Sequence, residues 1–258
     1  MNGRSEEATV KKDEVDKFAT INDWWDPQAR SARGLHSMNQ LRVPLIKDAL
    51  LKRPLASHHD EVATPLEGYT VLDVGCGAGL LCEPLARLGA RVKGIDPVAN
   101  SISVARDHAS LDPVLSGRLT YECCTMEDLL TAHEQYDAVV ASEVVEHVAD
   151  VGLFIKQQCQ LVKPGGVAVL TTINRTLTSY ALAIVMAEYV LGLLPRGTHT
   201  WSMFCTPEEL AGHLAATGMK VDQVRGMSYN PLNNQWSWGY QWVNYAIQAR
   251  KPVLSSWV

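Results

Sequence analysis

The stretch from residue 71 to residue 79 has the residue types and spacing of a ligand-binding turn. It reads Val-Leu-Asp-Val-Gly-Cys-Gly-Ala-Gly, so an apolar strand ends in an acid and glycines, and a helix is expected to follow. Glycines let the backbone turn sharply and let a ligand approach without meeting a Cβ atom. The free N–H groups of a helix N-terminus favour an anionic or carboxylate ligand. The next predicted strand, 91–95, leads to Asp96, where an acid commonly binds ribose hydroxyls. These features predict a nucleoside-cofactor site.

The glycine spacing and the acid before it indicate which cofactor binds. Gly75, Gly77 and Gly79 follow a G-x-G-x-G pattern, whereas a dinucleotide fingerprint reads G-x-G-x-x-G. Asp73 would repel a pyrophosphate, but its carboxylate could receive an ammonium group. S-adenosylmethionine carries an ammonium, a sulfonium and a ribose and no phosphate, so we expect this cofactor and exclude a dehydrogenase. The alternative is a strand-to-helix turn that binds no ligand.

A second group of chemically capable residues follows the fourth predicted strand. Glu143, Glu146 and His147 stand at i, i+3 and i+4, so they would share one face of a helix if a helix begins there. Open α/β sheets bind ligands at the carboxyl ends of their strands. Two carboxylates and an imidazole suit a hard or borderline divalent cation, with Mg²⁺ the expected ion. The alternative is a solvated helix start, where acids are stabilised by the helix dipole in any protein.

The combination of a methyl donor and a metal points to an oxygen acceptor. A phenol with a pKa of about 10 is mostly protonated at neutral pH. A divalent cation bound to both oxygens of a catechol lowers that pKa and orients one oxygen toward the methyl group. We therefore expect O-methyl transfer to a catechol or vicinal diol, in which Glu143, Glu146 and His147 act through the metal. His199 is a candidate fourth ligand, or else a surface or packing histidine.

Composition narrows the class of protein. A chain of 258 residues with 47% hydrophobic residues fits one sizeable α/β domain with additions. A net charge of -5 argues against a general nucleic-acid binder, so no nucleic-acid partner is expected. The six cysteines have no CxxC pair and no disulfide-framework spacing. They are interpreted as reduced packing residues in an intracellular compartment.

Alternation of apolar strands and helices predicts a parallel, doubly wound sheet. The predicted strands are 70–74, 91–95, 119–123, 136–141 and 167–172, and the helices between them are 79–88, 98–109, a short one after Met126, and 150–162. Residues 163–166, Lys-Pro-Gly-Gly, are predicted to form a turn before the fifth strand. A helix opening at Thr206 and an antiparallel strand pair, 220–227 and 244–251, are expected to close the domain.

The expected organisation is a disordered N-terminus followed by a single domain. Its parts are residues 1–17 (disordered), 18–68 (helical cap and linker), 69–172 (cofactor-binding core), 173–206 (inserted apolar helix or lid) and 207–258 (C-terminal helix and edge strands). The apolar helix, 177–194, is shorter than the about 20 residues that span a bilayer, and Glu188 interrupts it. We expect residues 177–196 to contact a membrane surface and cover the pocket. The alternative is a core or subunit-contact helix.

Several further stretches resemble the ubiquinone-biosynthesis O-methyltransferase family, specifically its mitochondrial branch. They are 24–26 (Trp-Trp-Asp), 35–39 (Leu-His-Ser-Met-Asn), 41–42 (Leu-Arg), 94–97 (Gly-Ile-Asp-Pro), 143–147, 172–175 (Thr-Ile-Asn-Arg), 195–199 (Pro-Arg-Gly-Thr-His) and 229–231 (Tyr-Asn-Pro). The resemblance covers about residues 18–250, and the glycine run is similar to motif I of class I S-adenosylmethionine-dependent methyltransferases. It implies that class I fold, with a seven-stranded, mostly parallel sheet.

The resemblance also implies substrates and site residues. The family methylates the 3-hydroxyl of 3,4-dihydroxy-5-polyprenylbenzoate and of demethylubiquinol. Its cofactor positions fall on Arg42, Gly75, Asp96 and Ser142, and its metal ligands fall on the Glu143, Glu146 and His147 triplet. Asp73 and Gly77 are expected in the same pocket, and Met126 is where this fold places adenine contacts.

The resemblance implies a location as well. It implies a mitochondrial enzyme, peripheral on the matrix side of the inner membrane, that works with other coenzyme Q biosynthesis proteins. Two alternatives stay open. One is a metal-dependent RNA 2′-O-methyltransferase, because a ribose diol is also vicinal. The other is a non-catalytic assembly subunit of a biosynthetic complex.

Overall fold

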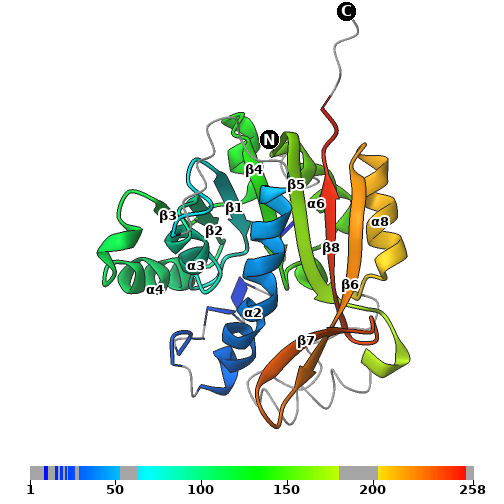
Figure 1. Ribbon diagram of the computed structural model, residues 1–258, viewed down its shortest axis with the longest axis horizontal. Helices are drawn as coiled ribbons and strands as arrows, with labels where there is room; N and C mark the ends of the chain where they lie inside the picture. Colours follow the sequence, from blue (N-terminus) through cyan, green and yellow to red (C-terminus); the bar gives the residue numbers. More distant parts are fainter. Residues whose placement is uncertain are drawn as a thin grey trace, which may run out of the picture.

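The computed structural model (Figure 1) describes residues 9–10, 15–16, 18–19, 21, 23–26, 29–52, 63–179 and 203–253. His199, most of the expected apolar helix, most of the expected disordered N-terminus and most of the expected linker lie outside these residues. Within these ranges, no helix is long and apolar enough to cross a membrane.

Eight strands of the described chain form one sheet, in the order β3-β2-β1-β4-β5-β8-β6-β7. Their bounds are β1 Thr70–Val74, β2 Arg91–Ile95, β3 Leu119–Glu122, β4 Tyr136–Ser142, β5 Val162–Ile173, β6 Lys220–Asn230, β7 Gln235–Gly239 and β8 Asn244–Arg250. Strands β1 to β5 are parallel, and β8 is antiparallel to both β5 and β6. The doubly wound, mostly parallel sheet and the closing antiparallel pair are therefore confirmed. The strand β7, which pairs with the end of β6, is an addition to the seven predicted strands.

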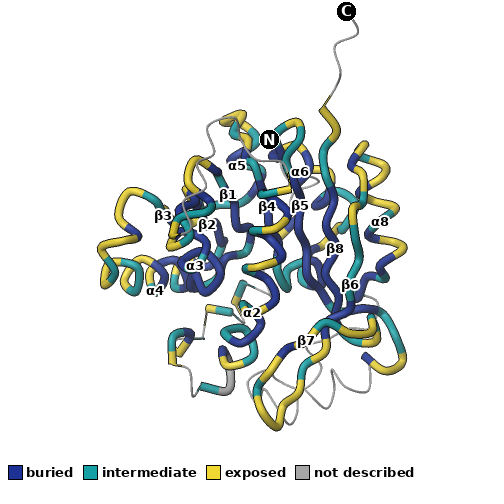
Figure 2. The backbone as a smooth tube through the Cα atoms, viewed as in Figure 1, coloured by how far each residue is buried: buried dark blue, intermediate teal, exposed yellow. Residues whose placement is uncertain are grey.

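Helices cover both faces of the sheet (Figure 1). They are α2 Arg30–Leu51, α3 Cys82–Arg87, α4 Ala99–Ala109, α5 Met126–Thr131, α6 Val151–Gln160 and α8 Pro207–Ala216. Successive strand residues point to opposite faces, so Val71 packs in a core with α2, α3 and α4, whereas Leu72 packs in a second core with α5, α6 and α8. Figure 2 shows the central strands buried, as expected for a sheet covered on both sides.

Residues 163–166 correct one local prediction. They lie within β5 and do not form a turn before it. Tyr136 pairs with Val162 and Ala138 pairs with Val167, so β5 contains extra residues that bulge out of the ladder. Gly165 takes a positive φ of 82°, and its N–H donates to the carbonyl of Lys251 at 2.8 Å. The Pro-Gly-Gly signal therefore marks an irregularity inside a strand.

The sheet order places the ligand site. The chain runs from β1 outward through β2 and β3, and then returns to build β4 and β5 on the other side of β1. The order therefore reverses between β1 and β4, and ligands of open α/β sheets bind at such a switch point, beyond the carboxyl ends of the strands. The glycine run follows β1, and the Glu143–His147 segment follows β4.

Candidate active site

A cavity of about 350 Å³ lies at this switch point. All of the predicted site residues within the described chain line it: Arg42, Asp73, Gly75, Gly77, Asp96, Met126, Ser142, Glu143, Glu146 and His147. Residues from the N-terminal segment, among them Phe18, Ile21 and Trp24, line it as well. The structure therefore brings together the two groups of residues that the sequence separates by about seventy positions.

The glycine loop leaves room for a ligand at one position and packs tightly at two others. Gly75, Gly77 and Gly79 all have positive φ, at 69°, 53° and 84°, a region that glycine enters without penalty. A Cβ atom at Gly75 would lie 2.6 Å from Cγ2 of Val144, and one at Gly79 would overlap the hydroxyl of Tyr121. A Cβ atom at Gly77 would meet only the ring of Trp24, at 3.7 Å. Gly77 is therefore the least tightly packed of the three glycines, with only the Trp24 ring in van der Waals contact at this point.

Asp96 orders the loop from the end of β2. It is 8% exposed. Its Oδ2 accepts a hydrogen bond from the Gly77 N–H at 2.9 Å, and its Oδ1 accepts one from the Val98 N–H at 2.8 Å. Burial raises the pKa of this carboxyl, and the two backbone donors oppose the shift. Each carboxylate oxygen keeps a second lone pair, so Asp96 can still accept hydrogen bonds from a ribose.

Asp73 is the penultimate residue of β1 and is buried beside the loop. Its Oδ2 accepts a hydrogen bond from the thiol of Cys82 at 3.1 Å. Burial raises the pKa of Asp73 to about 6, while the Cys82 thiol and the Arg42 charge oppose the rise. An ammonium group beside this carboxylate would favour its charged form. Asp73 therefore has the character expected of an acceptor for the amino group of S-adenosylmethionine.

Arg42 reaches the cavity from α2 and is 5% exposed. Its Nη1 donates to Oγ of Ser142 at 2.8 Å, and its Nη2 donates to the carbonyl of Leu35 at 2.9 Å and to Oδ1 of Asn39 at 2.7 Å. Burial lowers the pKa of the guanidinium, and the nearby carboxylates of Glu143 and Asp73 oppose this. Among the described residues it is held by neutral acceptors, which leaves it able to bind the carboxylate of a ligand. From the sequence alone it is an ordinary helix arginine.

No helix begins at residue 143, so the condition for a shared helix face at residues 143–147 is not met. Glu143 follows β4 directly with a φ of 59°, in the left-handed region. Val145–His147 is a single 3₁₀ turn, and α6 begins only at Val151, capped by Asp150, whose Oδ1 accepts from the Leu153 N–H at 2.9 Å. The triplet therefore lies in the strand-to-helix connection and not on one helical face.

Both carboxylates of the triplet are turned toward the sheet. Glu143 accepts hydrogen bonds from Oγ1 of Thr171 at 2.8 Å and from Nδ2 of Asn244 at 3.2 Å. Glu146 is 4% exposed and accepts one from Oγ1 of Thr172 at 2.7 Å. Burial, together with the negative charge of Glu146, raises the pKa of Glu143 to about 7. Two buried carboxylates that repel each other are a costly arrangement unless a cation or a proton offsets them.

The triplet fits a divalent cation in donor type but not in arrangement. Across the described part of the chain, no three side chains of His, Cys, Asp or Glu gather so that they could hold a metal ion. The ring of His147 packs edge-on against Phe18, with the ring centroids 5.2 Å apart. The expected metal site is therefore not formed by Glu143, Glu146 and His147 in this arrangement.

A hydrogen-bond chain that the sequence did not reveal joins the two halves of the site. Oγ of Ser142 is bonded to Arg42 on one side and lies 2.7 Å from Oγ1 of Thr171 on the other, and Thr171 donates to Glu143. Asn244 on β8 completes the chain at the second oxygen of Glu143. The signal in the sequence is the pair of threonines, 171 and 172, at the carboxyl end of an otherwise apolar strand.

Comparison with known proteins identifies the family. The family model described as "Methyltransferase domain" matches residues 45–224. The ubiquinone biosynthesis O-methyltransferase of Azorhizobium caulinodans is 45% identical, over 89% of this chain and 88% of the relative. The mitochondrial ubiquinone biosynthesis O-methyltransferase of Mus musculus is 50% identical over 94% of this chain. The chain belongs to the ubiquinone biosynthesis O-methyltransferase family. It spans 65% of the length of the mouse relative.

Solved structures share the fold at low sequence identity. Magnesium protoporphyrin IX methyltransferase from Synechocystis PCC 6803, solved with bound S-adenosylmethionine, superposes with a TM-score of 0.63 at 16% identity, over 97% of this chain and 100% of that chain. The N-methyltransferase NodS from Bradyrhizobium japonicum, solved with S-adenosylhomocysteine, superposes with a TM-score of 0.58 at 16% identity, over 93% of this chain and 97% of that chain. The described residues of this family member form a class I S-adenosylmethionine-dependent methyltransferase domain.

Proposed function

We propose that this methyltransferase acts in ubiquinone (coenzyme Q) biosynthesis. It transfers the methyl group of S-adenosylmethionine to the 3-hydroxyl of 3,4-dihydroxy-5-polyprenylbenzoate and of the corresponding demethylubiquinol. The observation that carries the proposal is the shared cavity, which is lined by the donor-binding residues and by the Glu143, Glu146 and His147 triplet. The relatives named ubiquinone biosynthesis O-methyltransferase support the pathway and O-methyl transfer.

The chain's own residues can hold the donor at both ends. Asp96 accepts hydrogen bonds from the ribose hydroxyls, since it directly follows β2 and lines the cavity. Arg42 binds the carboxylate of the methionine portion, and Asp73 receives its ammonium group. Holding donor and acceptor in one cavity of about 350 Å³ converts a bimolecular displacement into an effectively unimolecular step.

The finer proposal is that a divalent cation, Mg²⁺, assists the transfer. Glu143, Glu146 and His147, with His199 as a candidate fourth ligand, would supply its donors. When bound, the cation lowers the pKa of the catechol hydroxyl. The chemistry of the donors and the repulsion between two buried carboxylates support this proposal. Their arrangement does not, because in the described part of the chain no three side chains of His, Cys, Asp or Glu gather closely enough to hold a metal ion.

A direct assay tests the acceptor and the metal separately. The protein is incubated with methyl-labelled S-adenosylmethionine, a short-chain dihydroxybenzoate analogue and magnesium, with and without chelator. We expect label in the dihydroxybenzoate, loss of transfer with chelator, and no label in an RNA added as a competing acceptor. Absence of transfer to the dihydroxybenzoate would contradict the acceptor proposal and would favour the non-catalytic alternative. Transfer that is indifferent to chelator would contradict the metal alone.

We further propose that the enzyme is mitochondrial, peripheral on the matrix side of the inner membrane, with other coenzyme Q biosynthesis proteins as partners. A membrane surface, contacted through residues 177–196, would supply its lipid substrate. Leu177 is 81% exposed where this segment begins. Tyr240 and Trp242 stack beside it with ring centroids 4.9 Å apart and are 71% and 62% exposed, and Thr176 donates to the carbonyl of Trp242. Tyrosine and tryptophan are enriched at membrane–water interfaces.

Vesicle sedimentation tests the membrane surface. We expect Trp242→Ser to lower the fraction of protein that sediments with phosphatidylcholine vesicles containing an anionic phospholipid, because it removes an interfacial ring. Leu111→Ser is the matched control, since Leu111 lies beyond the end of α4 and is 76% exposed, more than Trp242. Equal sedimentation of the two variants and the wild type would contradict this surface.

A further inference from the structure

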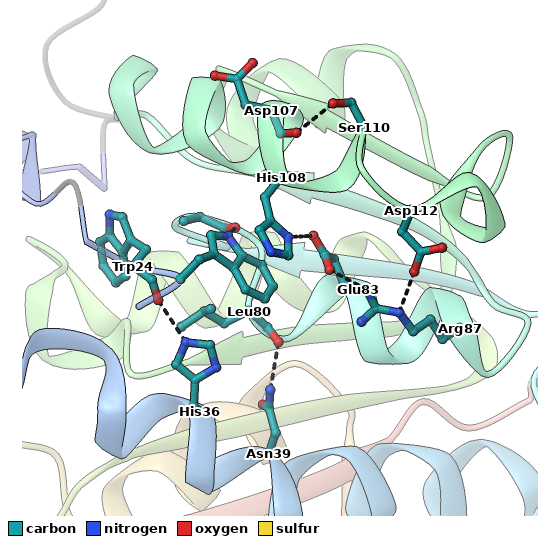
Figure 3. Close-up of polar contacts among 12 residues, drawn as sticks. Trp24, His36, Asn39, Leu80, Glu83, Arg87, Asp107, His108, Ser110 and Asp112 are labelled. Atoms are coloured by element: carbon teal, nitrogen blue, oxygen red, sulfur yellow. Dashed lines mark hydrogen bonds and ion pairs between the residues drawn. The ribbon is translucent and has the colours of Figure 1, made fainter. Parts of the chain in front are cut away.

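The segment 23–26 is tied down across the cofactor cavity by its second tryptophan. Nε1 of Trp25 donates to the carbonyl of Ala78 in the glycine loop at 3.0 Å. The ring of Trp25 stacks on His108 of α4, with ring centroids 3.5 Å apart and planes 2° from parallel. His108 is held in turn by the buried carboxylate of Glu83, 2.7 Å from its Nδ1 (Figure 3). Trp25 therefore fixes the N-terminal segment to the glycine loop and to α4.

The first tryptophan is held from the opposite side. Nε2 of His36, on α2, donates to the carbonyl of Trp24 at 2.9 Å (Figure 3). The Trp24 side chain is 6% exposed and lines the cavity. Its ring lies over Gly77, where a Cβ atom would be 3.7 Å from the ring. Trp24 is therefore a fixed part of the cavity wall beside the cofactor loop.

The indole N–H of Trp24 is buried and has no acceptor among the described residues. Buried N–H groups in folded proteins are nearly always hydrogen-bonded. Two other tryptophans of this chain follow that rule, because Nε1 of Trp25 donates to Ala78 and Nε1 of Trp236 donates to the carbonyl of Gly34. Since Trp24 lines the cavity, a ligand in the cavity can supply the missing acceptor.

We propose that Trp24 is a further cofactor-binding residue, whose ring covers the cofactor loop at Gly77 and whose Nε1–H donates to an oxygen of bound S-adenosylmethionine. The carboxylate, the two ribose hydroxyls and the ribose ring oxygen are the oxygens that this cofactor offers. Trp25 and His36 act as positioning residues. They hold Trp24 in place, and neither of them lines the cavity. The proposal rests on cofactor binding by this domain and not on the acceptor or metal proposed above.

The indole N–H signals test the proposal without turnover. The chain has seven tryptophans, and ¹⁵N labelling of their indoles gives one N–H signal each. Loss of one signal in Trp24→Phe assigns Trp24, and loss of another in Trp238→Phe assigns a tryptophan outside the cavity wall. On addition of S-adenosylhomocysteine we expect the Trp24 signal to shift downfield and the Trp238 signal to stay. An unmoved Trp24 signal in protein saturated with ligand overturns the proposal.

A second ligand and an affinity measurement locate the acceptor atom. 5′-Methylthioadenosine has the ribose but lacks the carboxylate, so a Trp24 shift with this ligand assigns the ribose, and a shift with S-adenosylhomocysteine alone assigns the carboxylate. Trp24→Phe keeps an aromatic ring and removes the donor. We expect it to raise the Kd for S-adenosylhomocysteine about tenfold with unchanged thermal unfolding of the ligand-free protein. An unchanged Kd overturns the proposal, and Trp238→Phe is the control.

Discussion

Arg42→Met is expected to raise the dissociation constant for S-adenosylhomocysteine by about a hundredfold. Removing one partner of a buried, hydrogen-bonded charge pair costs about 2–5 kcal/mol, and a tenfold change in affinity corresponds to about 1.4 kcal/mol. The guanidinium is buried, is held rigidly by Ser142, Leu35 and Asn39, and has only neutral acceptors among the described residues. A ligand carboxylate would therefore give Arg42 a charged hydrogen-bond acceptor, in addition to its longer-range interaction with Glu143 and Asp73.

Two controls separate this role from a structural one. Arg42→Lys keeps the charge but loses the planar fork, so we expect an intermediate affinity, measured by titration calorimetry. 5′-Methylthioadenosine lacks the carboxylate, so Arg42→Met should weaken its binding far less than it weakens that of S-adenosylhomocysteine. Equal losses for the two ligands would show that Arg42 supports the cavity without binding the carboxylate.

Glu143→Gln is expected to lower kcat by about a hundredfold and to leave the Kd for S-adenosylhomocysteine within about twofold of the wild type. The substitution preserves the size of a buried side chain and removes its charge at the acceptor side of the cavity. If the carboxylate is a metal ligand, its loss removes a stabilisation of several kcal/mol from the transition state. Rates at saturating cofactor, with and without magnesium, measure the effect.

The matched control is Glu122→Gln, because Glu122 is an exposed acid that ends β3 outside the cavity. It should leave kcat unchanged. In Glu143→Gln, addition of chelator should cause no further loss if Glu143 works through the metal. A wild-type kcat in Glu143→Gln would remove this residue from the chemistry.

Most of the fold could be predicted because local signals agree with the tertiary structure. Continuous apolar runs for β1, β4 and β5 are typical of strands covered on both faces, and the structure confirms them. The strand β7 was missed because it is short, lies at the sheet edge and depends on pairing with the end of β6. Residues 163–166 have the composition of a turn, yet they lie within β5 between Val162 and Val167, which both pair with β4.

Residues 143–147 show what spacing alone does not decide, namely whether a helix begins there. The i, i+3, i+4 spacing of Glu143, Glu146 and His147 is equally compatible with a loop, and the left-handed backbone at Glu143 depends on contacts that periodicity does not report. Asp150 was the better signal, because an acid before an apolar run can cap the helix N-terminus, and α6 starts directly after it.

Some cofactor-binding residues can be predicted from a short stretch of sequence, and others cannot. Asp73, Gly75, Gly77 and Asp96 follow from a strand–turn–helix pattern that the sequence displays. Arg42 came only from family resemblance, because its contact with Ser142 joins residues one hundred positions apart. The role of Trp24 likewise depends on a contact between distant parts of the chain, because its ring lies over the glycine loop only in the folded structure.

The most direct test of the central claim follows a trideuteromethyl group from S-adenosylmethionine to the acceptor. The acceptor is a 3,4-dihydroxybenzoate with a short prenyl chain, and mass spectrometry with NMR locates the label. The expected result is a single trideuteromethyl group on the 3-oxygen. Label on another atom, or no label from protein shown to bind S-adenosylhomocysteine, would contradict the claim that this cavity transfers a methyl group to one of two adjacent ring oxygens.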